Sequence, residues 1–119
     1  MVKLTTGGKL TTHVLDTANG CPAKGMTLRL YKGSKLLLKA KTNADGRVSA
    51  PLLEGKSFKA GKYRLEFSTA AYFKTKGAKL PKTPFLDVVT IDFGIADAKA
   101  HYHVPLLVSP YGYSTYRGS

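Results

Sequence analysis

Short apolar runs separated by turn residues divide this chain, and this pattern constrains the fold more than any other feature. Runs rich in leucine, β-branched and aromatic residues recur from Lys9 onward, with Gly, Pro, Asn and Asp between them. Such runs are typical of β-strands bounded by turns, whereas the 3.6-residue period of an amphipathic helix fits almost nowhere. The sequence therefore predicts an all-β protein.

The clearest hairpin is expected between residues 26 and 42. Leu28 and Leu30 alternate with Arg29 and Tyr31, as in a strand with one buried face. The Gly33-Ser34 pair then supplies a tight turn into the returning strand. Residues 43–47, which read NADGR, offer the next turn because Asn, Asp and Gly favour turn conformations.

The rest of the chain is interpreted in the same way. Strands are expected at residues 9–16, 26–32, 35–42, 50–53, 63–68, 88–97, 100–109 and 111–116. One short helix is expected at residues 69–77, with Thr69 capping its start and Gly77 its end. Seven or eight strands with one short helix favour a two-sheet β-sandwich, in a single domain that spans residues 1–119.

Composition excludes several classes of protein. Hydrophobic residues make up 43% of the chain, which is enough for a buried core and argues against disorder. Cys21 is the single cysteine, so no internal disulfide can form. No apolar run is long enough for a signal peptide or a membrane span. We therefore expect a soluble, cytoplasmic protein with no membrane partner.

The formal net charge of +12 has three possible explanations. The lysines are scattered and many alternate with apolar residues, as on a solvated strand face. Nucleic-acid binding would release counterions from phosphates, but it favours clustered basic residues beside exposed aromatics. Most of the tyrosines here lie in expected strands or at the C-terminus. Attraction of a small anionic substrate is the third explanation. We expect no nucleic-acid partner.

The three histidines give the first indication of chemistry. His101 and His103 are two residues apart in an expected strand, so both side chains should point to the same face, while His13 shares its face with Thr11 and Leu15. Three imidazoles could form a zinc site, but two closely spaced histidines and a distant third are a weak signal without a carboxylate or cysteine nearby. A structural role at the sandwich rim is the plainest interpretation. General acid–base work is the third, because a neutral imidazole can take a proton from water near pH 7.

Other catalytic patterns are weak in this sequence. It contains no Gly-x-Ser-x-Gly elbow and no Gly-rich phosphate loop before a helix. The carboxylates are few and mostly in turns, which argues against a paired-carboxylate mechanism. Arg47 leaves a tight turn, where a guanidinium could bind a planar oxyanion or amide, although an ordinary exposed turn residue is the simpler interpretation. No metal or cofactor is expected.

Four stretches together resemble a known family: LTTHVLDTANGCPAKGM, TNADGR, YRLEFSTAAYF and HYHVPLLVSPYGYSTYRGS. From residue 4 to residue 119 the chain resembles the transthyretin-related enzymes, the 5-hydroxyisourate hydrolases. The terminal Tyr-Arg-Gly-Ser is the motif of these hydrolases. Transthyretin, the hormone carrier with the same fold, lacks that motif and lacks the histidines at the positions of His13 and His103.

The resemblance implies a transthyretin-like sandwich of eight strands with one short helix, and a homotetramer, a dimer of dimers with active sites in a central channel. It also implies hydrolysis of 5-hydroxyisourate to 2-oxo-4-hydroxy-4-carboxy-5-ureidoimidazoline in urate degradation. On this basis His13 and His103 activate water and shuttle protons, and Arg47 stabilises developing negative charge. The floor of the site would be formed by Tyr116, Arg117, Gly118 and Ser119, with Tyr116 contacting the substrate and the Ser119 end acting in catalysis by orienting a histidine or the water.

Two questions stay open at this point. The general base can be either His13 or His103, while His101 is expected nearer the rim, where it supports the site or faces solvent. The alternative function is that of a non-catalytic carrier that binds a small ligand in the channel, as transthyretin does. Imidazoles and a terminal Arg-Gly-Ser argue against it, because a carrier would favour an apolar channel.

Overall fold

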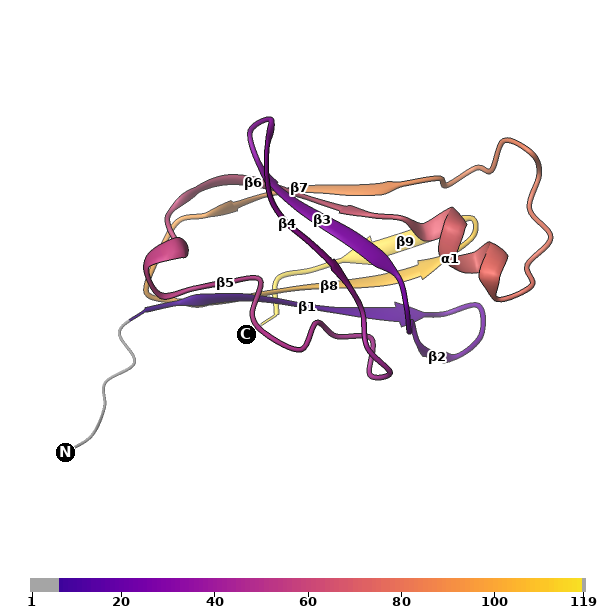
Figure 1. The fold of residues 1–119 in the computed structure, drawn as a ribbon, viewed down its shortest axis with the longest axis horizontal. Helices are drawn as coiled ribbons and strands as arrows, with labels where there is room; N and C mark the ends of the chain where they lie inside the picture. The colour runs from indigo at the N-terminus through magenta and orange to yellow at the C-terminus, as the bar shows by residue number, and fades with distance from the viewer. Residues whose placement is uncertain (1–6, 119) are drawn as a thin grey trace.

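A computed structural model describes residues 7–118, which form a sandwich of two β-sheets (Figure 1). The first sheet contains β1 (Lys9–Asp16), β2 (Cys21–Pro22), β5 (Leu53–Glu54), β8 (His101–Ser109) and β9 (Gly112–Thr115). The second contains β3 (Thr27–Lys32), β4 (Lys35–Lys41), β6 (Gly61–Phe67) and β7 (Val89–Ile95). The expected all-β sandwich is confirmed.

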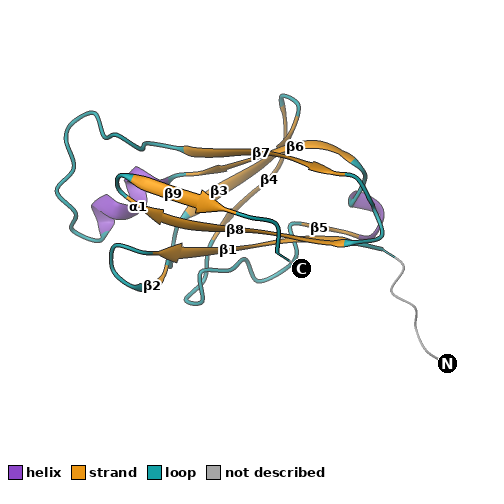
Figure 2. Ribbon diagram, turned by 180° about the vertical axis from the view of Figure 1, so that it is seen from behind, coloured by secondary structure: helices purple, strands orange, loops and turns teal. Residues whose placement is uncertain are grey.

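The strand order places the beginning of the chain beside its later part. The first sheet runs β2-β1-β8-β9, with β5 also paired to β1, and the second runs β4-β3-β6-β7. Figure 2 shows β1, β8 and β9 side by side. The β1–β8 pair is parallel, so its two strands must be joined by a long crossover. Residues far apart in sequence therefore become neighbours on this sheet.

Alternating side chains in β1 explain how the sandwich closes. Leu10, Thr12, Val14 and Asp16 are buried between the sheets, while the residues between them lie on the outer face. The second sheet meets them with its own alternating leucines and aromatics, of which Phe67 is fully buried. Each large apolar side chain buried in this way stabilises the fold by about 1.5–3 kcal/mol.

The hairpin between β3 and β4 turns at Gly33, as expected. This glycine has φ +62, in the left-handed region that residues with a side chain rarely adopt. The pairing register shifts between Leu30 and Tyr31, which marks a bulge in the hairpin.

The helix α1 spans Thr69–Thr75, and the prediction of its cap was wrong. Ser68 is the N-cap residue, without a side-chain cap hydrogen bond. Thr69 lies inside the helix, and its hydroxyl donates to the carbonyl of Asp87 at 3.0 Å, because the loop before β7 packs there. Gly77, with φ +84, ends the helix as predicted.

Several element boundaries differ from expectation. The short strand expected at residues 50–53 is β5 at Leu53–Glu54, followed by a 3-10 turn at Gly55–Ser57. The two-residue strand β2 was expected to be part of a turn. It was missed because two paired residues leave no alternation to detect. No helix in residues 7–118 is long and apolar enough to cross a membrane.

Candidate active site

The parallel β1–β8 ladder gathers the histidines on the outer face of the first sheet. Its register places Thr11 opposite His103 and Lys9 opposite His101, with His13 two residues further along β1. Thr11 and all three histidines are half-buried. The prediction that His101 and His103 share a face is confirmed, since both rings reach the same hydroxyl group.

That hydroxyl belongs to Thr11. Its Oγ1 lies 2.9 Å from His101 Nε2 and 2.8 Å from His103 Nδ1. The two ring centroids are 6.4 Å apart, so the hydroxyl lies between them. His101 therefore contacts the same group as His103, although it also borders an open hollow of about 390 Å³, lined by Ala100, His101, Arg117 and Gly118.

The turn at residues 43–47 is held by its own side chains. Asn43 Oδ1 accepts the backbone N–H groups of Asp45 at 2.9 Å and of Arg47 at 3.1 Å. Gly46 has φ +75, and a Cβ added there would lie 2.4 Å from the carbonyl oxygen of Val14. Only glycine lets the turn approach β1 this closely. The turn predicted from the sequence at this place is confirmed.

His13 is fixed by the same turn. Its Nε2 lies 2.8 Å from the Asp45 carbonyl oxygen, and an isolated β-bridge joins His13 to Arg47. A carbonyl oxygen can only accept a hydrogen bond, so Nε2 must carry the proton. Neutral His13 therefore has its lone pair on Nδ1. The exposed Arg47 is held next to this imidazole.

The electrostatic surroundings favour a neutral His103. Burial lowers the pKa of His103 below its ordinary value of 6.5, and the positive charge of Arg47 and the neighbouring His101 and His13 lower it further. A neutral ring hydrogen-bonded through Nδ1 presents Nε2 as the remaining nitrogen. Near pH 7 His103 is therefore ready to accept a proton.

The C-terminal segment closes against His103. The Gly118 N–H donates to the His103 carbonyl oxygen at 2.7 Å, and the two residues form an isolated bridge. A Cβ added to Gly118 would lie 2.7 Å from Cδ2 of the His103 ring, which is closer than real contacts allow. A side chain at position 118 would therefore force either the imidazole or the C-terminal segment to shift.

Two other expected floor residues, Arg117 and Tyr116, lie near Tyr102 in this chain. The Arg117 guanidinium lies 4.0 Å from the centroid of the Tyr102 ring and donates to the His101 carbonyl oxygen at 3.4 Å. Tyr102 points between the sheets, away from the histidines. Tyr116 is 60% exposed and lines a hollow together with Tyr102. Ser119 lies outside the described residues.

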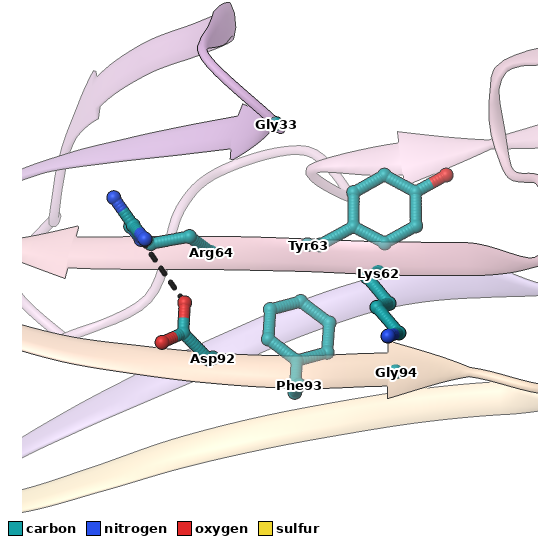
Figure 3. A pocket seen from close by; sticks show the side chains of 7 residues that line it. All are labelled: Gly33, Lys62, Tyr63, Arg64, Asp92, Phe93 and Gly94. Atoms are coloured by element: carbon teal, nitrogen blue, oxygen red, sulfur yellow. Dashed lines mark hydrogen bonds and ion pairs between the residues drawn. The ribbon is translucent and has the colours of Figure 1, made fainter.

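A larger hollow, of about 450 Å³, lies across β6 and β7 at the other sheet (Figure 3). It is lined by Gly33, Lys62, Tyr63, Arg64, Asp92, Phe93 and Gly94, and none of the expected site residues is among them. Figure 3 shows Arg64 and Asp92 facing each other, with Nε and Oδ1 3.0 Å apart. Because these charges satisfy one another, we place the chemistry at the histidines despite the larger volume.

Sequence reasoning missed the part played by Thr11. The alternation of β1 placed it on the face of His13, but its contact with His101 and His103 depends on the pairing of β1 with β8. Only a motif linking the two strands could have indicated this contact. In residues 7–118 no group of three or more His, Cys, Asp and Glu residues is arranged to hold a metal ion.

A family model described as "HIUase/Transthyretin family" matches residues 10–118. Among curated proteins, 5-hydroxyisourate hydrolase 2 of Rhizobium meliloti is 56% identical over 94% of this chain and 97% of its own length. The 5-hydroxyisourate hydrolase of Mesorhizobium japonicum is 57% identical over 95% of this chain and 94% of its own length.

Solved structures give the same result for the fold. Klebsiella pneumoniae 5-hydroxyisourate hydrolase superposes with a TM-score of 0.79 at 37% identity, over 94% of both chains. Sea bream transthyretin in complex with thyroxine gives 0.82 at 30% identity, over 92% of this chain and 94% of the other. An (S)-allantoin synthase gives 0.93 at 47% identity, and this chain spans 45% of that longer chain. The transthyretin-like sandwich is therefore confirmed.

Proposed function

Because the chain belongs to the HIUase/transthyretin family, we propose that it hydrolyses 5-hydroxyisourate to 2-oxo-4-hydroxy-4-carboxy-5-ureidoimidazoline in the degradation of urate. The curated relatives named above carry the name of this hydrolase, which confirms the enzyme class expected from the sequence. The observation that carries the proposal is the cluster formed by His13, His103 and Arg47 on one face of the first sheet.

In this reaction His103 acts as the general base. Its unprotonated Nε2 removes a proton from water, whose oxygen then attacks an acyl carbon of the substrate ring. The N–C bond breaks, and the leaving nitrogen takes a proton. General acid–base catalysis of this kind contributes about 10²–10⁴-fold to a rate. The lowered pKa of His103 supports this assignment, because the ring must be neutral to accept the proton.

Arg47, from the turn after β4, and His13, from β1, complete the site beside His103. The Arg47 guanidinium binds the substrate carbonyl and stabilises the negative charge that develops on its oxygen. His13, with Nε2 held by the Asp45 carbonyl, offers Nδ1 to the substrate. The exposure of Arg47 supports this role, since its side chain is free to meet a ligand.

The remaining residues act in an assembly. The working enzyme is a homotetramer, a dimer of dimers, in which Tyr116, Arg117, Gly118 and Ser119 form the floor of a shared channel. Two features support this. The strands β7 and β9 are at the edges of their sheets, where a second copy can add its own strands. Aromatic side chains are also exposed along β9 and its turn, with Tyr111 64% and Tyr113 47% exposed.

The location and the extent of the functional unit are parts of the same proposal. We place the enzyme in the cytoplasm, with residues 1–119 as one catalytic domain and no nucleic-acid or membrane partner. Transport of a small ligand in the channel is the alternative. The half-buried imidazoles and the adjacent guanidinium favour hydrolysis. An apolar ligand bound against them would leave these polar groups without hydrogen-bond partners.

An absorbance assay tests the proposal. Freshly made 5-hydroxyisourate is followed in the ultraviolet with and without the chain, and spontaneous decay is subtracted. We expect clear acceleration by the chain and at least about a 100-fold lower kcat for His103→Asn. Light scattering should give the same tetrameric mass for both proteins. Ligand binding without acceleration would instead support the carrier.

A further inference from the structure

The Thr11 hydroxyl has one proton to share between two imidazoles. It lies within hydrogen-bond distance of both His101 Nε2 and His103 Nδ1, at 2.9 and 2.8 Å. A hydroxyl donates once and accepts twice, so it cannot donate to both rings. At least one ring must therefore donate to it. When the hydroxyl donates to His101, it accepts the Nδ1–H of His103, and Nε2 of His103 is left bare.

We propose that Thr11 and His101 form a proton relay that carries the proton taken up by His103 out to solvent. This inference rests on the hydrolase function proposed above, in which His103 is the base. Thr11 and His101 are then positioning and proton-transfer residues that act through His103, and neither needs to touch the substrate.

Each hop of the relay conserves protons. His103 Nε2 takes a proton from water, the Nδ1 proton of His103 moves to the Thr11 oxygen, and the Thr11 proton moves to His101 Nε2. His103 is then neutral with its proton on Nε2, while His101 is an imidazolium that releases its Nδ1 proton to solvent. In reverse, the relay delivers a proton through His103 Nε2 to the leaving nitrogen. No bond to carbon changes within the relay.

The surroundings of His103 and His101 differ, and the difference favours proton transfer from His103 to His101. His103 is enclosed by the Gly118 backbone and faces the Arg47 charge, so a proton is held poorly there. His101 borders the open hollow of about 390 Å³ beside Ala100, so its far nitrogen can reach water. The proton therefore moves from the more enclosed imidazole to the more open one.

Neighbouring elements present mainly basic groups to the relay. His13 and Lys9 come from β1, with Lys9 in register with His101, and Arg47 comes from the turn after β4. Arg117 reaches the His101 carbonyl from the C-terminal segment, and Asp45 contacts His13 through its backbone carbonyl. Besides burial, Arg47, His101 and His13 lower the pKa of His103, so a proton taken up by that ring is not retained there.

The test uses the full chain with Thr11→Val, which removes the hydroxyl but keeps a β-branched side chain suited to a strand. We expect kcat to fall about 10-fold or more with KM nearly unchanged, since proton transfer is impaired while binding is not. Added imidazole should restore part of the rate, because it can take the proton directly. Thr11→Ser should keep most of the activity.

The matched control is Thr17→Val, which removes a hydroxyl that donates to the Val108 carbonyl at 3.1 Å, beyond the end of the same strand. It should leave kcat unchanged. His101→Gln is the second variant, and it covers the case in which Thr11→Val does not fold. Glutamine can hydrogen-bond to Thr11 but cannot carry the proton away. It should therefore show the same loss of kcat and the same rescue by imidazole.

Histidine titrations followed by ¹⁵N NMR test the relay without substrate. In the unaltered chain His101 and His103 should titrate as a coupled pair, and in Thr11→Val they should titrate independently. Unchanged kcat together with unchanged titrations in Thr11→Val would overturn the relay. So would a loss of activity that imidazole does not relieve, since that is the result of a purely structural role.

The two proposals can fail separately. If the unaltered chain does not accelerate hydrolysis, the proposed function fails, and the relay is then judged by the titrations alone. Coupled titrations would support the hydrogen-bonded chain of groups, and independent titrations would overturn it. If hydrolysis is fast but Thr11→Val is as active as the unaltered chain, the relay fails and the hydrolase stands.

Discussion

The polar side chains on the two outer faces of the sandwich differ in their exposure to solvent. On the first sheet, Thr11, His13 and His103 are half-buried and make hydrogen bonds that cross between strands or reach a turn. On the second, Arg64 and Asp92 pair at 3.0 Å with side chains that are 47% and 71% exposed. Water screens the exposed pair and leaves it weak, whereas burial shifts the pKa of His103.

This difference indicates that half-burial of polar side chains, rather than the number of formal charges, distinguishes the face on which we propose catalysis. The chain has a net charge of +12, but charge alone does not locate the candidate site. Lys39, Lys41 and Lys62 are exposed on the second sheet, away from the histidines. The first sheet has fewer formal charges but fixed imidazoles. Matched substitutions on the two faces can break or sharpen the comparison.

The largest effect is expected from Arg47→Met. Losing the guanidinium proposed to stabilise developing negative charge should lower kcat/KM about 100-fold or more. Arg64→Met, the matched change on the second sheet, should leave kcat/KM within about 2-fold, since surface ion pairs contribute little. Steady-state kinetics on both variants checks this. Equal losses would mean that the faces do not differ in the way described.

A smaller loss is expected from Gly118→Ala. The added methyl group would press on the His103 ring, at 2.7 Å from Cδ2, and move either the ring or the C-terminal segment. Displacements of this size cost about 10–100-fold in rate. The control is Gly94→Ala on β7, where the nearest atom to an added Cβ is 3.9 Å away. A Gly118→Ala enzyme with full kcat would contradict the close packing described here.

The pH dependence of the rate sharpens the comparison further. Burial, followed by the Arg47 charge, lowers the pKa of His103 below 6.5, and catalysis needs the neutral ring. Activity should therefore be retained at neutral pH and fall as the pH drops through that lowered pKa. In Arg47→Met the pKa of His103 rises, so the acid limb of log kcat/KM should move to higher pH. An unmoved limb would show that another group controls it.

The smallest effect is expected from Asp92→Asn. It breaks the solvent-exposed ion pair with Arg64, so the urea midpoint and the melting temperature should shift too little to resolve. Activity should also stay within about 2-fold of the unaltered chain. A clear loss of stability would show that the second face depends on its surface charges, which would remove the contrast between the two faces.

The sequence predicted local features well because their causes are local. Alternation in residues 9–16 placed β1 and its buried face, and the glycine at position 33 placed a hairpin. The helix cap was misassigned because the partner of Thr69 is the carbonyl of Asp87, 18 residues away. The two-residue strand β2 has no periodicity to detect. A partner distant in the sequence decided the helix cap, whereas β2 pairs with the nearby end of β1 and is only too short to show a pattern.

The site was predictable only in part for the same reason. His13, Arg47 and His103 were selected by resemblance and by alternation, and the structure places them on one face. The shared contact of Thr11 could not be foreseen, because it requires the parallel pairing of β1 and β8. The direction of Arg117 toward Tyr102 depends on a cation–π contact that strand alternation does not encode.

The parallel pairing of β1 with β8 has a consequence for biosynthesis. Thr11 and His103 are 92 positions apart, so a ribosome must release nearly all of the intervening polypeptide before the two can meet. Contacts with such large sequence separation form slowly and late. A nascent chain can therefore shape its β3–β4 hairpin early and still be inert. The contact between Thr11 and His103 therefore forms only after β8 has been synthesised and has paired with β1.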